Sequence, residues 1–276
     1  MSMKVGLIAG DGNFPLEVAK SIYQQEKKVF IIALKGSASK DIEQYPHLWI
    51  RIGQIGKAIK ALKENHCEEL IIIGGVKKPN VLFLNPDFGA LKLFIKLLML
   101  PVKGDASILK ALLNFLEIDN NFKIIGAEKY ISHLLMAEGL IAGQKIDDKT
   151  RNDINIAIEI CKDIGSKDIG QACVVANGKI IASENVLGTD KMLKDIILRK
   201  IRFKNEGVLV KLAKPIQDRR VDLPAIGMKT IELIKEIGLS GIALEEKSSF
   251  ISEKEKVIQF ANENNIFIFG ISNGKT

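Results

Sequence analysis

The chain has 276 residues, of which 47% are hydrophobic and 26% charged, with 23 glycines and 7 prolines. This composition is typical of a globular protein and excludes collagen-like, low-complexity and disordered classes, while the length favours two domains. The formal net charge is +7 and the isoelectric point is near 9.1, which suits anionic partners. Aromatic residues make up only 6% and no dense basic block is present, so we expect no nucleic-acid partner.

The cysteines and the first residues bear on the compartment. Three cysteines are too few for a disulfide framework, and no CxxC pair suggests zinc, so we expect a reducing cytoplasm. The opening MSMKVGLIAGDG contains an apolar run of about five residues, too short for a signal peptide or a membrane span.

The first half of the chain alternates between short apolar runs and helical periodicity. Strands are predicted at 4–9, 29–34, 48–52, 70–74 and 122–126, and helices at 15–25, 55–65 and in two stretches before the last strand. This alternation predicts a Rossmann-like parallel sheet with helices on both faces. Right-handed crossovers would then place the loops at 10–12 and 74–76 along one edge.

The second half has a different character. We predict domains at 1–136 and 150–276, joined by a linker at 137–149 that carries glycine, polar residues and weak periodicity. A helix is predicted at 150–163, and 172–176 and 179–183 should form a hairpin, because Asn177-Gly178 suits a type I′ turn. A helix at 190–200, a strand at 207–212 and two further helix–strand pairs, ending with a strand at 266–271, predict a mixed-sheet α/β domain.

Two glycine-rich loops follow predicted strands of the first half. Gly10, Gly12, Asn13 and Phe14 lie between a strand and a helix, where backbone N–H groups could approach an anion. Pro15 stands where a dinucleotide fingerprint needs glycine, and a plain tight turn explains this loop equally well. In the loop at 74–78, Gly75 and Lys77 could contact a phosphate or a ribose, although paired glycines after a strand are common.

Two segments of the second half gather polar residues. Glu184, Gly188, Thr189 and Asp190 connect a strand to a helix and could hold a ribose, a phosphate or a metal; the alternative is that Thr189 is a simple N-cap. The segment 214–227 follows a strand and contains Lys214, Gln217, Asp218, Arg219, Arg220 and Asp222. Carboxylates of this kind suit hard divalent cations and the cations suit phosphates, although a surface salt-bridge cluster is the simpler explanation.

The absent motifs narrow the chemistry. The three histidines show no HExxH or HxH spacing and the chain has no GxSxG elbow, which disfavours serine hydrolysis and histidine-rich metal sites. A carboxylate-bound Mg²⁺ acting on a phosphate is the chemistry that the remaining residues support.

The stretch 83–100 is strongly apolar, and Lys92 and Lys96 are its main polar residues. It is too short to span a bilayer, so it could lie on one, line an acyl-chain groove or form a core helix. Without further information the core helix is the favoured interpretation.

Seven stretches, in this order, resemble the LpxI family of UDP-2,3-diacylglucosamine diphosphatases: GLIAGDGNFP, IGQIGKAIKAL, GGVKKP, KGDASIL, DIGQACVV, GTDKML and KPIQDRRVDLPAIGMKTI. The resemblance implies two α/β domains that hold the substrate between them. It implies Mg²⁺-dependent hydrolysis of the substrate's diphosphate, by water attack on the β-phosphorus, to UMP and 2,3-diacylglucosamine 1-phosphate in lipid A synthesis. It also adds Lys103, within KGDASIL, to the substrate-binding candidates, and it favours an apolar lining or membrane role for 83–100.

The resulting hypothesis assigns roles residue by residue. Asp222, matched by the RVDLP motif, ligates Mg²⁺ or orients the attacking water, with Asp190 or Glu184 as helpers. Lys214 and Arg220 are the phosphate clamps. We further expect docking on the cytoplasmic face of the inner membrane and a homodimer. The alternatives are a nucleotide-binding oxidoreductase using the Gly10 loop and a non-catalytic membrane-surface module.

Overall fold

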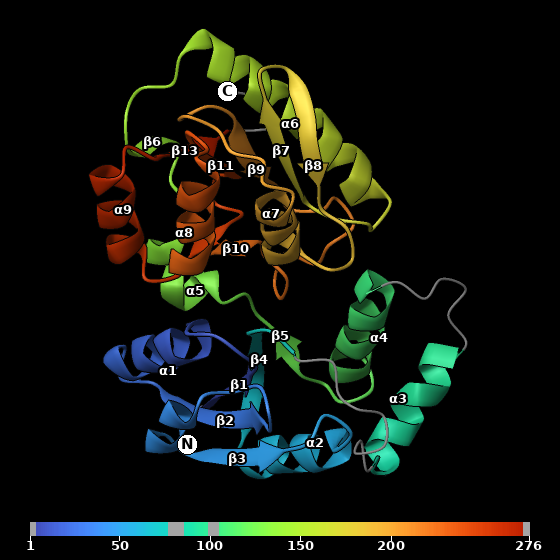
Figure 1. Ribbon diagram of the computed structural model, residues 1–276. Helices are drawn as coiled ribbons and strands as arrows, with labels where there is room; N and C mark the ends of the chain where they lie inside the picture. Colours follow the sequence, from blue (N-terminus) through green and yellow to red (C-terminus); the bar gives the residue numbers. More distant parts are fainter. Residues whose placement is uncertain (1–3, 77–85, 99–104, 273–276) are drawn as a thin grey trace. The chain divides into compact units, whose positions relative to one another are not determined.

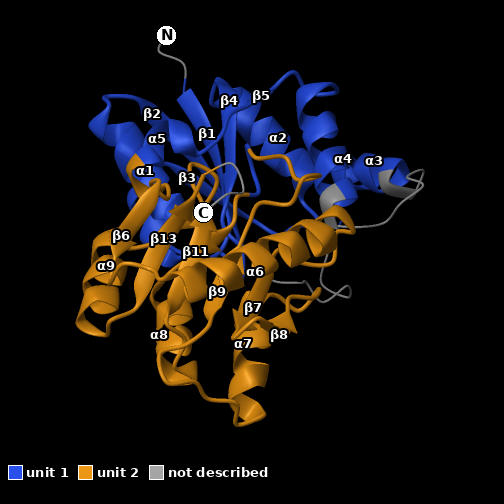
Figure 2. Ribbon diagram, turned by 90° about the horizontal axis from the view of Figure 1, so that it is seen from above, with its two compact units in different colours: residues 1–132, 220–222 blue, residues 133–219, 223–276 orange. Residues whose placement is uncertain are grey.

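The computed structural model describes residues 4–76, 86–98 and 105–272. The chain divides into two compact units, which are coloured separately in Figure 2. The first comprises Met1–Ser132 with Arg220–Asp222, and the second comprises His133–Arg219 with Leu223–Thr276. The division assigns three residues from the second half of the chain to the first unit.

Among the described residues, the first unit holds a five-stranded parallel sheet in the order β3-β2-β1-β4-β5 (Figure 1). Its strands are β1 (Lys4–Ala9), β2 (Lys28–Leu34), β3 (His47–Ile50), β4 (Cys67–Ile73) and β5 (Lys123–Ile124). The helices are α1 (Phe14–Gln24), α2 (Ile55–Glu64), α3 (Phe88–Leu98), α4 (Asp105–Glu117) and α5 (Glu128–Ile131). Apolar strands buried on both faces explain the near-continuous hydrophobic runs that predicted this sheet.

One hydrophobic cluster joins that sheet to α2, α3 and α4. It includes Ile32, Leu62, Leu70, Leu93 and Leu116, all buried. Among the α3 side chains that the structure describes, Leu93 contacts the core and is 6% exposed.

The second unit holds a mixed sheet in the order β6-β13-β11-β9-β7-β8, in which the central strands are parallel and the flanking ones antiparallel. Its strands are β6 (Gly139–Ala142), β7 (Ala172–Ala176), β8 (Lys179–Ser183), β9 (Val208–Lys211), β11 (Gly241–Glu245) and β13 (Phe267–Ile271). Two short strands, β10 (Ala225–Ile226) and β12 (Phe250–Ile251), pair separately. One face of the main sheet packs on α6 (Asp148–Ser166), and another cluster joins it to α7 (Thr189–Leu198), α8 (Met228–Ile237) and α9 (Lys254–Glu263).

The hairpin prediction is confirmed residue by residue. β7 and β8 are joined by Asn177 and Gly178, with φ angles of 54° and 73°. Both positive values are those of a type I′ turn. Asp153 of α6 accepts hydrogen bonds from the N–H groups of both turn residues, at 3.0 and 2.7 Å.

The segment 137–149, assigned from sequence to a linker, contains a strand. β6 pairs antiparallel with β13 at one edge of the second sheet. It is only four residues long and begins at Gly139 with a positive φ of 78°, so it carries no alternation long enough to detect. This part of the chain therefore belongs to the second sheet.

Candidate functional site

The two glycine loops of the first unit meet at the carboxyl edge of the sheet. The Asp11 N–H donates to the Gly75 carbonyl at 2.6 Å, and the Gly75 N–H donates to the Asp11 carbonyl at 3.0 Å. A Cβ on Gly10 would lie 2.4 Å from the Gly75 carbonyl oxygen, so no larger residue fits there. The predicted placement of the two loops along one edge is confirmed.

This edge has the topology of a ligand-binding crevice. From β1 the chain builds β2 and β3 on one side and β4 and β5 on the other, so the order reverses between β1 and β4. Open α/β sheets bind ligands outside the carboxyl ends of their strands at such a point. Gly12 and Asn13 are exposed there, and Phe14 starts α1. Lys77 lies outside the described residues, as does Lys103.

In the second unit, Glu184 is part of a buried polar network at the end of β8. Its carboxylate accepts from the Gln171 N–H at 2.9 Å and from the Thr189 hydroxyl at 3.0 Å. The Lys211 ammonium donates to the Thr189 oxygen at 3.0 Å and to the Ala225 carbonyl at 3.2 Å. Glu184, Thr189 and Lys211 are each less than 10% exposed. The structure thus gives Thr189 a bridging contact inside the unit and gives each Glu184 oxygen a protein donor.

Gly188 and Asp190 lie at the start of α7. Gly188 has a φ of 88°, a left-handed value that favours glycine, and it precedes the first helical residue. The Asp190 carboxylate forms an ion pair with Lys229 of α8. Asp190 is therefore neutralised from its own unit.

The first part of segment 214–227 is held in the second unit. The Lys214 ammonium pairs with Asp168 at 2.8 Å, and both side chains are 17% exposed. The Lys214 N–H donates to the Gln217 amide oxygen at 3.0 Å. The amide nitrogen of Gln217 is buried and has no hydrogen-bond partner in the described part of the chain. A buried donor of this kind needs an explanation, and a ligand oxygen is one.

The next residues, Arg220–Asp222, belong to the first unit. Arg220 binds the Glu117 carboxylate of α4 with both terminal nitrogens, at 2.6 and 3.2 Å. Val221 packs against the apolar cluster of that unit, and Asp222 is exposed. The bidentate pair fixes Arg220, two residues before Asp222.

Sequence reasoning missed three residues that support this segment. Glu245, at the end of β11, accepts from the Ala213 N–H at 3.0 Å and from Arg219 at 2.9 Å. Arg219 also donates to Ser248 at 2.8 Å, and Glu117 binds Arg220 as described. A Glu245-Glu246 pair closing an apolar strand is the one signal that could have indicated the first of them.

The carboxylates predicted as metal ligands do not form a preassembled centre. Among the described residues, no group of three or more histidine, cysteine, aspartate or glutamate side chains could hold a metal ion. Each Glu184 oxygen accepts a hydrogen bond from a protein donor, Asp190 pairs with Lys229, and Asp222 lies at the surface. Mg²⁺ is commonly held by one or two carboxylates together with substrate phosphates and water, so this donor set fits a metal that arrives with a diphosphate.

Helix α3 covers the core on one side and exposes apolar side chains elsewhere. Phe88 is 72% exposed, Phe94 is 55% exposed, and Leu91 and Ile95 are about half exposed. The core-helix interpretation therefore holds for Leu93 and fails for these four. Within the described residues no helix is long and apolar enough to cross a membrane.

Comparison with known families matches both units. The LpxI N-terminal domain matches residues 4–134 and the LpxI C-terminal domain matches residues 137–269. The UDP-2,3-diacylglucosamine pyrophosphatase LpxI of Caulobacter vibrioides is 34% identical over 273 residues, which cover 97% of each chain.

Solved structures show a weaker similarity. The biotin carboxylase domain of Hydrogenobacter thermophilus 2-oxoglutarate carboxylase is 13% identical with a TM-score of 0.26; the match covers 73% of this chain and 40% of that one. The UDP-N-acetylglucosamine 4-epimerase of Bacillus cereus is 11% identical with a TM-score of 0.30, over 98% and 86% of the two chains. Scores at this level carry no argument about function.

Proposed function

The chain belongs to the LpxI family, and on that basis we propose that it hydrolyses the diphosphate of UDP-2,3-diacylglucosamine in lipid A synthesis. The products would be UMP and 2,3-diacylglucosamine 1-phosphate. The observation that carries the proposal is the near full-length identity to a UDP-2,3-diacylglucosamine pyrophosphatase. The geometry of the candidate residues supports it in three respects.

The first support concerns the nucleotide. Gly10, Gly12, Asn13, Phe14 and Gly75 gather at the strand-order reversal of the first sheet, where backbone N–H groups and the α1 N-terminus favour an anion. We propose that the uridine nucleotide binds at this edge.

The second support concerns the reacting phosphates. In the proposed reaction Asp222 orients the attacking water and the buried Gln217 amide donates to a phosphoryl oxygen. Lys214 and Arg220 are each ion-paired, so their charges are positioned and would be shared between a carboxylate and the diphosphate. Lys77, Lys103, Gly188 and Thr189 stay predictions as substrate ligands, as does the holding of substrate between the domains.

The third support concerns Mg²⁺. We propose that Asp222 holds the ion together with the diphosphate oxygens, with Asp190 or Glu184 as helpers. Bound there, the ion would neutralise negative charge on the phosphoryl oxygens. Asp222 would then position water against a phosphorus that is made more electrophilic.

Incubation with UDP-2,3-diacylglucosamine and Mg²⁺, followed by assay for UMP, tests the proposal. The Asp222→Ala variant should lose turnover by about a thousandfold or more while still binding substrate, because the loss falls on the transition state. Asp148→Ala, which removes an exposed carboxylate of α6, is the matched control and should keep activity. Absence of UMP from the wild type would contradict the function, and normal kcat in Asp222→Ala would contradict the role of that residue.

We also propose that the protein docks on a membrane surface through α3, because its substrate carries two acyl chains. Exposed Phe88, Leu91 and Phe94 on one helix, in a chain of net charge +7, suit an anionic lipid surface. Flotation with vesicles tests this proposal. The homodimer stays a prediction.

A further inference from the structure

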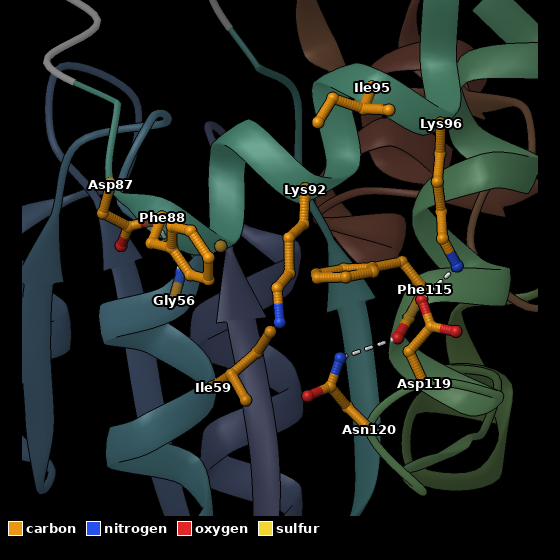
Figure 3. Close-up of a pocket in the computed structure, with 11 residues that line it drawn as sticks. Gly56, Ile59, Asp87, Phe88, Lys92, Ile95, Lys96, Phe115, Asp119 and Asn120 are labelled. Carbon is orange, nitrogen blue, oxygen red and sulfur yellow. Dashed lines mark hydrogen bonds and ion pairs between the residues drawn. The ribbon is translucent and has the colours of Figure 1, made fainter. Parts of the chain in front are cut away.

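A cavity of about 650 Å³ lies within the first unit, bordered by α2, α3 and the end of α4 (Figure 3). Its apolar wall consists of Ile59, Phe88, Ile95 and Phe115. Its volume falls in the range of pockets that hold small organic ligands. Among the described residues, no candidate from the glycine loops or from segments 184–190 and 214–222 lines it.

Close contact between two helix N-termini forms one end of the cavity. A Cβ on Gly89 of α3 would lie 2.6 Å from the Gly56 Cα of α2, so a glycine is needed at position 89 for this approach. Asp87 fastens the contact by accepting from the N–H groups of Gly56, Lys57 and Ala90 at 2.9 to 3.0 Å. This end of the cavity is therefore fixed by backbone packing and by the hydrogen bonds of Asp87.

Lysine stems complete the lining. Figure 3 shows Lys92 extending between Phe88 and Phe115, with its ammonium 5.0 Å from the Phe88 ring centroid. Lys96 pairs with Asp119 and lies 5.7 Å from the Phe115 ring. Lysine stems commonly cover apolar surface while the charged group stays near water. The cavity lining thus holds two lysines and two carboxylates, Asp87 and Asp119, so the charges balance and the apolar wall is the feature that suits a hydrocarbon chain.

Helix α4 contributes both to the cavity and to the contacts of the segment that carries Asp222. Phe115 lines the cavity, and Glu117, two residues further on, binds Arg220. Val221 packs against the cluster that contains Phe115 and Leu93. One helix therefore supports both the cavity and the segment that carries Asp222, and both lie in the first unit.

We infer that this cavity between α2, α3 and α4 binds one acyl chain of the diacylated substrate. The inference rests on the proposed function and gives a binding site for an acyl chain, a part of the substrate that does not react. Apolar burial is worth about 0.8 kcal/mol per methylene, which is about fourfold in affinity. Binding should therefore depend on chain length until the cavity is filled.

Steady-state UMP release from substrates with four-carbon and ten-carbon chains, below the concentration of micelle formation, tests the inference. We expect KM to fall about fourfold for each methylene that enters the cavity. In Ile95→Ser, KM for the ten-carbon substrate should rise about tenfold, because apolar contact is lost, while the four-carbon substrate is unaffected. Ile118→Ser, an equally drastic change at a side chain that is 72% exposed and does not line the cavity, is the matched control.

A photoreactive substrate with a diazirine at the end of one acyl chain supplies a readout independent of rate. Crosslinks to α3 or to the end of α4 would support the assignment. Three results would overturn the assignment: equal KM values for both chain lengths, equal behaviour of Ile95→Ser and Ile118→Ser, or crosslinks confined to other elements. If UMP is still released in these experiments, the proposed function stands. No UMP from any substrate would instead overturn the proposed function, and the assignment that rests on it.

Discussion

Glu245 contacts both ends of the loop that leads to Asp222. It accepts from the Ala213 backbone and from the Arg219 guanidinium, which also binds Ser248. Glu245→Gln removes the charge that holds Arg219, so we expect kcat to fall about tenfold to a hundredfold with KM nearly unchanged, as misplacement of a reacting group does. UMP-release kinetics measure this. Glu236→Gln, which breaks the exposed Arg202–Glu236 pair, should leave kcat unaltered, and an equal loss there would remove the special role of Glu245.

Thr189 links Glu184 to Lys211 in the buried network of the second unit. The isosteric change Thr189→Val removes a hydroxyl that donates and accepts, so the free energy of unfolding should fall by about 2 kcal/mol. Thr189→Ser keeps the hydroxyl and should lose less than half of that. Urea unfolding at pH 7 measures both. A Val variant of normal stability but raised KM would instead make Thr189 a substrate ligand, as the sequence analysis proposed.

These residues show what a sequence alone conceals. The chemistry-bearing segment 214–222 could be singled out because its carboxylates and cations stand together after a strand. The partner of Arg220 could not be identified from the sequence, because Glu117 lies 103 positions away on α4. The residues around Glu117 contain no motif that indicates its role. Glu184 was predicted as a metal ligand from its residue type, whereas its role depends on donors from Gln171 and Thr189.

At the scale of elements, α3 depends on Asp87. Burial raises the pKa of this carboxyl, but backbone N–H donors from Ala90, Lys57, Gly56 and Gly89 outweigh it, and the pKa is lowered overall. A lowered folded-state pKa gives stability that is present above the unfolded value of about 3.9 and is lost as pH falls through the folded value. The attachment of α3 to α2 should therefore weaken in acid.

The Asp87→Asn variant tests this pH dependence. At pH 7 it should be less stable than the wild type by about 1 kcal/mol, the usual worth of a capping carboxylate. The difference should begin to shrink below about pH 4, where the unfolded carboxyl takes up a proton, and should vanish only below the lowered folded-state pKa, where the wild-type carboxyl is neutral in both states. Urea unfolding between pH 3 and pH 7 gives both curves. The control is Glu64→Gln, at a side chain that is 62% exposed, whose free energy of unfolding should stay within about 0.5 kcal/mol of the wild type. A difference in stability between Asp87→Asn and the wild type that does not change with pH would refute the argument.

The helices and strands could be predicted where the residues of the segment itself favour that structure. The strand–helix alternation and the Asn177-Gly178 hairpin are local signals, and both are confirmed. β6 carries no such signal because an edge strand of four residues is defined by its pairing with β13. The apolar composition of α3 predicted a helix, but which of its faces is buried depends on contacts with α2 and α4.

In the proposed docking on an anionic bilayer, the net charge of +7 and the exposed apolar side chains of α3 would both contribute. The double variant Leu91→Ser, Phe94→Ser removes two apolar side chains that are 49% and 55% exposed. Burial of one such side chain is worth roughly 1.5–3 kcal/mol, so the partition of the protein onto vesicles should weaken about tenfold or more. Leu198→Ser, at an apolar residue of α7 that is 73% exposed, is the control and should bind as the wild type does. Flotation with neutral and anionic vesicles, at low and high salt, separates the two contributions: lysines near an anionic surface add about 1 kcal/mol each, and salt screens this part alone. Flotation of the double variant equal to that of the wild type on both vesicle types would show that α3 does not face the membrane.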